Sequence, residues 1–145
     1  MNDIRKINIA FTPNYSNINM VRAAIRGICA DFFLLPENTE IIMDFCLIVT
    51  ELMNNAVEHS HSQEINVELS LTDHEAIFSL ISDGNGFDPT QRATMPEVEA
   101  DELPEGGYGL AIIQALADDI EYQCLENKNM VTLRKSFPRK DVKEL

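Results

Sequence analysis

The chain has 145 residues and a mass of 16.4 kDa, the size of one ordinary domain. Apolar residues make up 45% of it and charged residues 24%, the usual mix of a globular protein. No stretch approaches the roughly 18 apolar residues of a membrane span, and the first residues lack the apolar core of a signal peptide. We therefore expect a single cytoplasmic domain over residues 1–145 that does not bind a membrane.

The charge is strongly negative, with 24 acidic residues against 11 basic ones and a net charge of −13. Between Arg26 and Lys128 the sequence holds 21 acidic residues and a single basic one, Arg92. Such a surface cannot neutralise a phosphate backbone, so we expect no nucleic-acid partner. A basic protein partner stays possible, although solubility alone also explains the charge.

The cysteines and histidines give no sign of a disulfide framework or a zinc site. Cys29, Cys46 and Cys124 form an odd, scattered set, as expected of reduced thiols. The first two fall within apolar helical patterns, which indicates core packing. The three histidines match no zinc-ligand spacing.

The first half of the chain predicts one strand and two helices. Residues 4–11 alternate between apolar and polar, as in a half-buried strand. Ser16 is expected to cap a helix with one apolar stripe, which the Leu35-Pro36 step ends. A second helix is expected over about residues 39–59, with its stripe centred on Ile48.

The second half predicts two hairpins on either side of a long loop and a short helix. The expected elements are strands 64–71 and 76–81, a loop over 83–106, a helix over 108–117, and strands 120–126 and 130–137. The turn of the second hairpin is expected at Asn127-Lys128-Asn129, and residues 138–145 are expected to form a charged tail. A loop of this length is usually functional or disordered.

This order predicts an α/β (α+β) two-layer sandwich with its core at about residues 5–137. Consecutive strands joined by short turns favour a mixed, mainly antiparallel sheet, and three helices would cover one face.

Two polar residues of the second helix lie beside its apolar stripe. At 100° per residue, Glu51 and Asn55 fall about 60° and about 20° from the stripe centre at Ile48. Burying them without partners would cost a few kcal/mol. Either they are satisfied locally or they line a cavity for a polar ligand.

Two glycine clusters follow, one after a strand and one where a helix opens. They are Ser82-Asp83-Gly84-Asn85-Gly86 and Gly106-Gly107-Tyr108-Gly109-Leu110. Glycines allow a backbone to approach a ligand closely, and a helix N-terminus offers N–H groups to phosphate. Neither cluster has the spacing of a dinucleotide site or a P-loop, and each alone is more often a plain turn.

Together the three segments resemble the GHKL ATPase superfamily, which includes histidine kinases and type II topoisomerases. Residues 51–59 resemble its N box, residues 84–89 its first glycine box and residues 107–113 its second. Residues 117–122 and 129–135 are typical of one branch, the small bacterial anti-sigma factors that are also serine/threonine kinases. The resemblance covers roughly residues 7–137 and implies the Bergerat, or histidine-kinase-like ATPase, fold.

The resemblance implies a role for each matching residue, with ATP and Mg²⁺ as cofactors. Glu51 would be the general base, Asn55 would hold Mg²⁺, and residues 88–106 would form the ATP lid. The residues implied in cofactor binding are Asn55, Ser82, Asp83, Gly84, Gly86, Arg92, Gly107, Tyr108, Gly109 and Leu110.

Two features depart from the family pattern. Ser82 stands where the first glycine box normally has an aspartate that accepts a hydrogen bond from the adenine amino group. Ser82 accepts that bond more weakly, or a backbone shift brings Asp83 inward instead. The lid also carries six carboxylates against Arg92 alone.

The resemblance implies an anti-sigma factor that phosphorylates a STAS-domain anti-anti-sigma protein, binds a sigma factor and forms a homodimer. Glu51 and Asn55 favour this active kinase. Ser82 and the acidic lid favour a partner-binding module with weak nucleotide binding and little or no kinase activity. A third possibility is an interaction domain that keeps the boxes only as relics of the fold.

Overall fold

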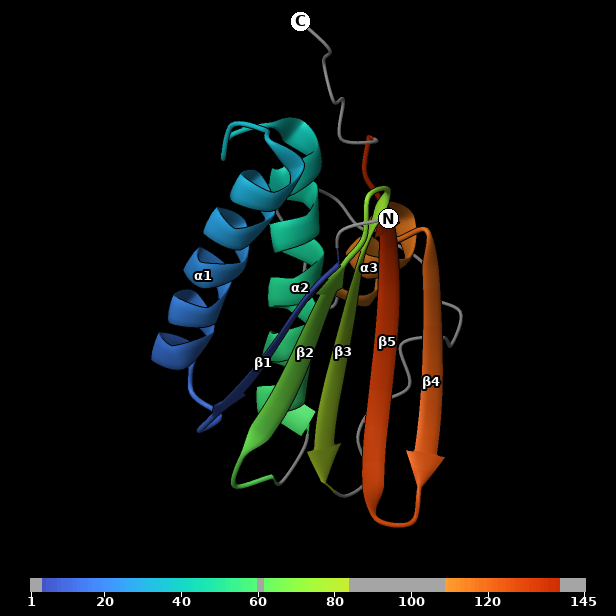
Figure 1. The fold of residues 1–145 in the computed structure, drawn as a ribbon. Coiled ribbons are helices and arrows are strands. Elements are labelled where there is room, and N and C mark those ends of the chain that lie inside the picture. The colour runs from blue at the N-terminus through green and yellow to red at the C-terminus, as the bar shows by residue number, and fades with distance from the viewer. Residues whose placement is uncertain (1–3, 60–61, 84–108, 139–145) are drawn as a thin grey trace, which may run out of the picture.

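The computed structural model describes residues 4–59, 62–83 and 109–138 (Figure 1). These residues form five strands and three helices. In chain order the elements are β1 (Arg5–Phe11), α1 (Tyr15–Phe33), α2 (Glu40–His59), β2 (Ile65–Leu71), β3 (Glu75–Asp83), α3 (Gly109–Leu116), β4 (Asp119–Leu125) and β5 (Lys128–Ser136).

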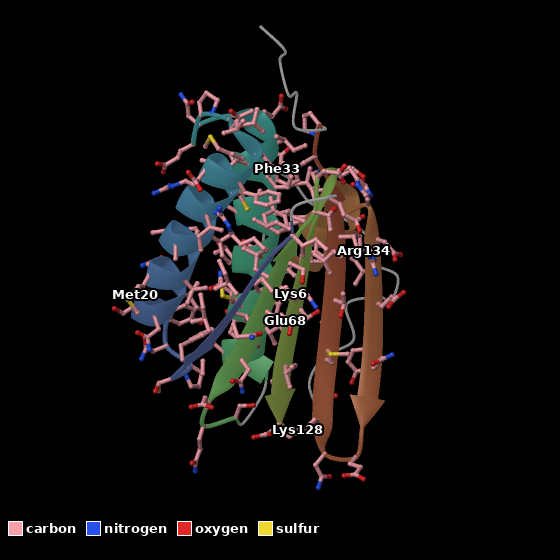
Figure 2. All side chains as sticks on the ribbon, viewed as in Figure 1. Lys6, Met20, Phe33, Glu68, Lys128 and Arg134 are labelled. Carbon is pink, nitrogen blue, oxygen red and sulfur yellow. The ribbon has the colours of Figure 1, made fainter. Side chains whose placement is uncertain are left out.

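The strands form one sheet in the order β1-β2-β3-β5-β4, and every pairing in it is antiparallel. The three helices lie on one face of this sheet (Figure 1). No described helix covers the other face, which we call the open face. The predicted two-layer sandwich with a mainly antiparallel sheet is therefore confirmed. Figure 2 shows Lys6, Glu68 and Arg134 on the open face, where polar side chains alternate with the inward-facing apolar ones.

The core lies between the sheet and the helices. Its largest fully buried side chains are Phe32, Phe45, Phe78, Ile18, Ile25, Ile42, Ile48, Leu52, Met53, Ile65, Leu71 and Ile113. The apolar stripes of α1 and α2 supply most of these residues, because each helix turns one face to the sheet. Cys29 and Cys46 are buried in the same cluster, as predicted.

Helix α1 differs from the expectation at both ends. Its N-cap is Asn14, not Ser16, and the Asn14 Oδ1 accepts the backbone N–H of Asn17 at 2.8 Å. The helix ends at Phe33, where Leu34 adopts a left-handed conformation with φ of 58°. The prediction of Ser16 was wrong because an Asn caps a helix as well as a Ser does.

The two hairpins also have different limits from those expected. Strand β3 continues through Asp83, so Ser82 and Asp83 belong to the sheet and not to the loop. In the second hairpin the turn is Glu126-Asn127, with Glu126 at a positive φ of 56°, and Lys128 and Asn129 already pair in β5. The predicted turn at residues 127–129 was wrong because two residues suffice to reverse an antiparallel pair.

Among the described helices, none has the length and apolar content needed to cross a membrane.

Candidate functional site

The C-terminal half of α2 carries two polar residues at the edge of the core. Glu51 and Asn55 are both half-buried, on a helix whose neighbouring positions Leu52 and Ala56 are buried. Within the described part of the chain, neither side chain has a hydrogen-bond partner. The described residues therefore do not supply the local hydrogen-bond partners that were one of the two alternatives for Glu51 and Asn55.

The Glu51 carboxyl lies in an environment that disfavours its charge. Its pKa is raised, chiefly because burial removes water from the carboxylate and secondly because the Glu58 carboxylate repels it. Glu58 lies two turns further along α2, and the Tyr15 hydroxyl of α1 donates a hydrogen bond to it at 3.3 Å. A raised pKa brings a carboxylate closer to the basicity that a general base needs near neutral pH.

The last two residues of β3 point to opposite sides of the sheet. Ser82 faces the helices and is only 5% exposed. Asp83 is exposed, and its Oδ1 lies 3.3 Å from the Lys128 Nζ at the start of β5. The alternative in which Asp83 turns inward is therefore wrong, and Ser82 is the residue that faces the helix layer.

Ser82 is the buried polar group that the fold does not explain. Thr50 donates to the backbone oxygen of Cys46 at 2.6 Å, and Ser62 accepts the backbone N–H of Asp83 at 2.5 Å. By contrast, no described residue hydrogen-bonds to the Ser82 hydroxyl. A buried hydroxyl without a hydrogen bond costs about 1–3 kcal/mol of stability. A ligand that hydrogen-bonds to Ser82 would remove this cost.

Asn129 was missed by the sequence reasoning. It pairs directly with Ser82 across β3 and β5, is 2% exposed, and its Oδ1 accepts the Tyr122 hydroxyl of β4 at 2.6 Å. Strand alternation back from the buried Leu133 and Val131 would have placed it on the inner face. The predicted turn at residues 127–129 included Asn129, so this alternation was not extended to it.

The sandwich brings together the elements that carry these residues. Helix α2 contacts both β3 and α3. The C-terminal ends of α2 and β3 and the start of β5 all lie at the lower end in Figure 1. Glu51, Asn55, Ser82 and Asn129 thus come from elements that meet on the helix side of the sheet.

The remaining predicted site residues are not all visible. Gly84, Gly86, Arg92, Gly107 and Tyr108 lie outside the described residues, as does the lid at 88–106. Gly109 and Leu110 are the first two residues of α3. Their predicted roles stay predictions.

The polar groups present fit a nucleotide with a divalent cation. Asn55 offers one side-chain oxygen, and Mg²⁺ is commonly held by one or two protein ligands together with substrate phosphates and water. The unsatisfied hydroxyl of Ser82 fits a ligand that hydrogen-bonds inside the site. A carboxylate with a raised pKa on the same helix as the amide suits proton transfer next to a phosphate.

The chain is similar to proteins of known function. A serine-protein kinase RsbW of Oceanobacillus iheyensis is 27% identical over 128 residues, which cover 82% of this chain and 78% of the relative. An anti-sigma F factor of Clostridium perfringens is 22% identical over 135 residues, 90% of this chain and 94% of the relative.

A solved structure has the same fold. The crystal structure of the RsbU and RsbW domains of a Mycobacterium tuberculosis protein matches with a TM-score of 0.62 and 21% identity. The match covers 96% of this chain and 35% of that one. The family model described as a histidine kinase-like ATPase domain matches residues 11–135. The chain therefore belongs to the histidine kinase-like ATPase domain family.

Proposed function

We propose that this chain is an ATP-dependent serine/threonine protein kinase that also acts as an anti-sigma factor in a partner-switching system. The observation that carries the proposal is the Glu51–Asn55 pair, one helical turn apart at the core edge and without a described side-chain partner. Membership of the ATPase domain family and relatives named as a serine-protein kinase and an anti-sigma factor support it.

In this proposal each residue has one task. The Glu51 carboxylate accepts the proton of a substrate serine or threonine hydroxyl, and Asn55 holds Mg²⁺ through its side-chain oxygen. ATP, when bound, would supply the phosphoryl group for the hydroxyl oxygen, with ADP as the leaving group. Position and charge stabilisation are the main contributions that a protein makes to such a transfer.

The proposed partners follow from the resemblance to the small bacterial anti-sigma factors that are also serine/threonine kinases. The protein substrate is a STAS-domain anti-anti-sigma protein, and the sequestered partner is a sigma factor. We further propose a homodimer, a cytoplasmic location and one domain over residues 1–145. Light scattering of the purified chain distinguishes a dimer from a monomer.

A phosphotransfer assay tests the proposal. The full chain is mixed with Mg²⁺, ATP and its cognate STAS-domain protein, and the phosphorylated product is counted by mass spectrometry. We expect Glu51→Gln to lower the rate by about 10²- to 10⁴-fold, the usual contribution of a general base. Glu68→Gln, on the open face of β2, is the matched control and should retain the wild-type rate.

The phosphotransfer assay also distinguishes the kinase from the second candidate function, a partner-binding module. Ser82 in place of an aspartate favours a partner-binding module with weak nucleotide binding. Stable binding of the sigma factor by wild-type protein that transfers no phosphate would support that module and contradict the kinase.

A further inference from the structure

The open face of the sheet has an apolar centre. Ile77 and Ile81 of β3 and Met130 of β5 are half-buried there, because they alternate with buried residues that face the helices. A cavity of about 430 Å³ lies against Ile81 and Met130, with Glu126 and Lys128 as its other lining residues. None of the described helices covers this centre, so it is available to a partner.

Two basic residues of the open face have a carboxylate partner in the same chain. The Arg134 Nη1 lies 2.9 Å from the Glu75 Oε1, and the Lys128 Nζ lies 3.3 Å from the Asp83 Oδ1. Lys6 of β1 lies on the same face (Figure 2), but its ammonium group has no carboxylate partner in the part of the chain that the structure describes.

Lys6 and Asp119 stand at opposite ends of one row of residues across the sheet. The row runs from Lys6 through Ser70, Ile77 and Arg134 to Asp119, and each residue is opposite the next in the antiparallel register. Both end residues are exposed, and Asp119 likewise forms no ion pair with a described residue. The row therefore ends in a free cation at β1 and a free anion at β4, within the described residues.

A second copy of the chain fits this pattern when it lies face to face on the first. The two-fold axis then runs along β3, the middle strand of the five, so that β2 faces β5 and β1 faces β4 of the other copy. Lys6 faces Asp119 of the other copy, and this contact occurs twice. Ile77 and Ile81 meet their own copies near the axis. Packed sheets keep their strand directions within about 30° of each other, which leaves facing rows close together.

The neighbouring rows bring no like charges together in this arrangement. In the next row, Glu68 faces Thr132 and Glu121 faces Asn8 of the other copy. The row after it holds no charge and consists of Ala10, Asn66, Ile81, Met130 and Gln123. Copies of a chain with a net charge of −13 repel each other, so self-association requires a face of this kind.

We propose that the open face of the sheet is the contact surface for a second copy of this chain, in a two-fold dimer with Lys6–Asp119 ion pairs around an apolar centre at Ile77 and Ile81. This inference rests on the homodimer of the proposed function and deepens it by naming the contact face.

Two charge-reversal variants and their mixture test this face. Sedimentation equilibrium of the full chain gives the dimer dissociation constant of the wild type, of Lys6→Glu and of Asp119→Lys. We expect each variant to raise that constant by about tenfold or more, because two like-charge contacts replace two ion pairs.

The equal mixture of the two variants is the sharpest arm of the experiment. In a dimer of one Lys6→Glu copy and one Asp119→Lys copy, the new glutamate faces the new lysine, and the unchanged Lys6 faces the unchanged Asp119. We therefore expect the mixture to dimerise within about threefold of the wild type. A contact without two-fold symmetry through these residues gives no such rescue.

Two further variants serve as controls on the helix side of the molecule. Arg26→Glu makes the same charge change at an exposed position of α1, where Arg26 pairs with Glu37 at 3.2 Å, and should leave the dimer dissociation constant within about threefold of the wild type. Met43→Asp puts a charge on the helix layer, where Met43 is 56% exposed, and should leave the constant equally unchanged. Loss of the dimer in Met43→Asp alone would place the contact on the helices and overturn the inference.

The remaining outcomes separate the contact face from the proposed function. Unchanged dissociation constants in both charge-reversal variants would overturn the face, as would a mixture that dimerises no better than its components. A wild-type chain that stays monomeric would overturn this inference and the proposed homodimer together. Absence of phosphotransfer in a chain that dimerises as expected would overturn the kinase and leave the contact face standing.

Discussion

At the scale of single residues, the Glu51 carboxylate lowers the stability of the folded state. Its pKa is raised by burial and by the Glu58 carboxylate, so the folded state favours the neutral form of the carboxyl. A group with a raised folded pKa contributes its stability below the unfolded pKa and loses it as the pH rises through the folded pKa. At neutral pH the ionised Glu51 therefore destabilises the protein.

Glu51→Gln, which mimics the neutral carboxyl, should stabilise the fold while it removes the base. We expect its melting temperature to exceed that of the wild type at pH 7, with the difference shrinking as the pH falls towards 4. Thermal unfolding followed by circular dichroism at both pH values measures this. Equal melting temperatures of Glu51→Gln and the wild type at pH 7 would mean that Glu51 is fully solvated. Glu40→Gln, at an exposed position of α2, serves as the control.

At the scale of elements, the end of α1 stores backbone strain. Leu34 takes the left-handed conformation at φ 58° and ψ 47°, its N–H bonds to the Ala30 oxygen, and its side chain is 71% exposed. This conformation costs a residue with a Cβ atom about 1–2 kcal/mol, whereas glycine adopts it freely. Leucine here gains little from burial that would offset the strain.

Leu34→Gly should therefore stabilise the protein by about 1 kcal/mol. Chemical denaturation gives the free energy of unfolding. Leu47→Gly, the same substitution inside α2, should instead destabilise by about 1 kcal/mol because glycine weakens a helix interior. A loss of stability in Leu34→Gly would show that the exposed leucine side chain matters more than the strain.

The helices and strands show what the sequence could and could not predict. Alternation and helical stripes were strong enough to identify the five strands and three helices of the described residues. Boundaries failed where two solutions were equally good locally, as with Asn14 and Ser16 at the N-cap of α1. At the β4–β5 turn, the two-residue reversal at Glu126-Asn127 moved Asn129 into the strand and onto the inner face. The pairing of Ser82 with Asn129 depends on strand order, which local patterns do not contain.

At the scale of the whole molecule, the end of β5 joins the two layers. Phe137 is buried, stacks on Phe33 with ring centroids 4.2 Å apart, and meets Phe45 edge-on at 5.8 Å. Its N–H also donates to the backbone oxygen of His74 at 2.9 Å. The Phe137 side chain thus connects the end of the last strand to α1 and α2.

Phe137→Ala should lower the free energy of unfolding by about 3–5 kcal/mol, the range for removing a buried aromatic side chain. Urea denaturation of the full chain measures it. Pro138→Ala, at the exposed neighbouring position, should change the stability by less than about 0.5 kcal/mol. A cost below about 1 kcal/mol for Phe137→Ala would show that the two layers hold together without this contact.

The proposed function depends on a nucleotide site that needs Asn55 and a divalent cation. The most direct test is calorimetric titration of the purified full chain with ATP, with Mg²⁺ and then with EDTA. We expect binding in the micromolar range that requires Mg²⁺, and at least about tenfold weaker binding by Asn55→Ala, since that change removes a metal ligand. No binding at millimolar ATP would contradict the proposed function. Equal binding with EDTA and in Asn55→Ala would contradict it as well.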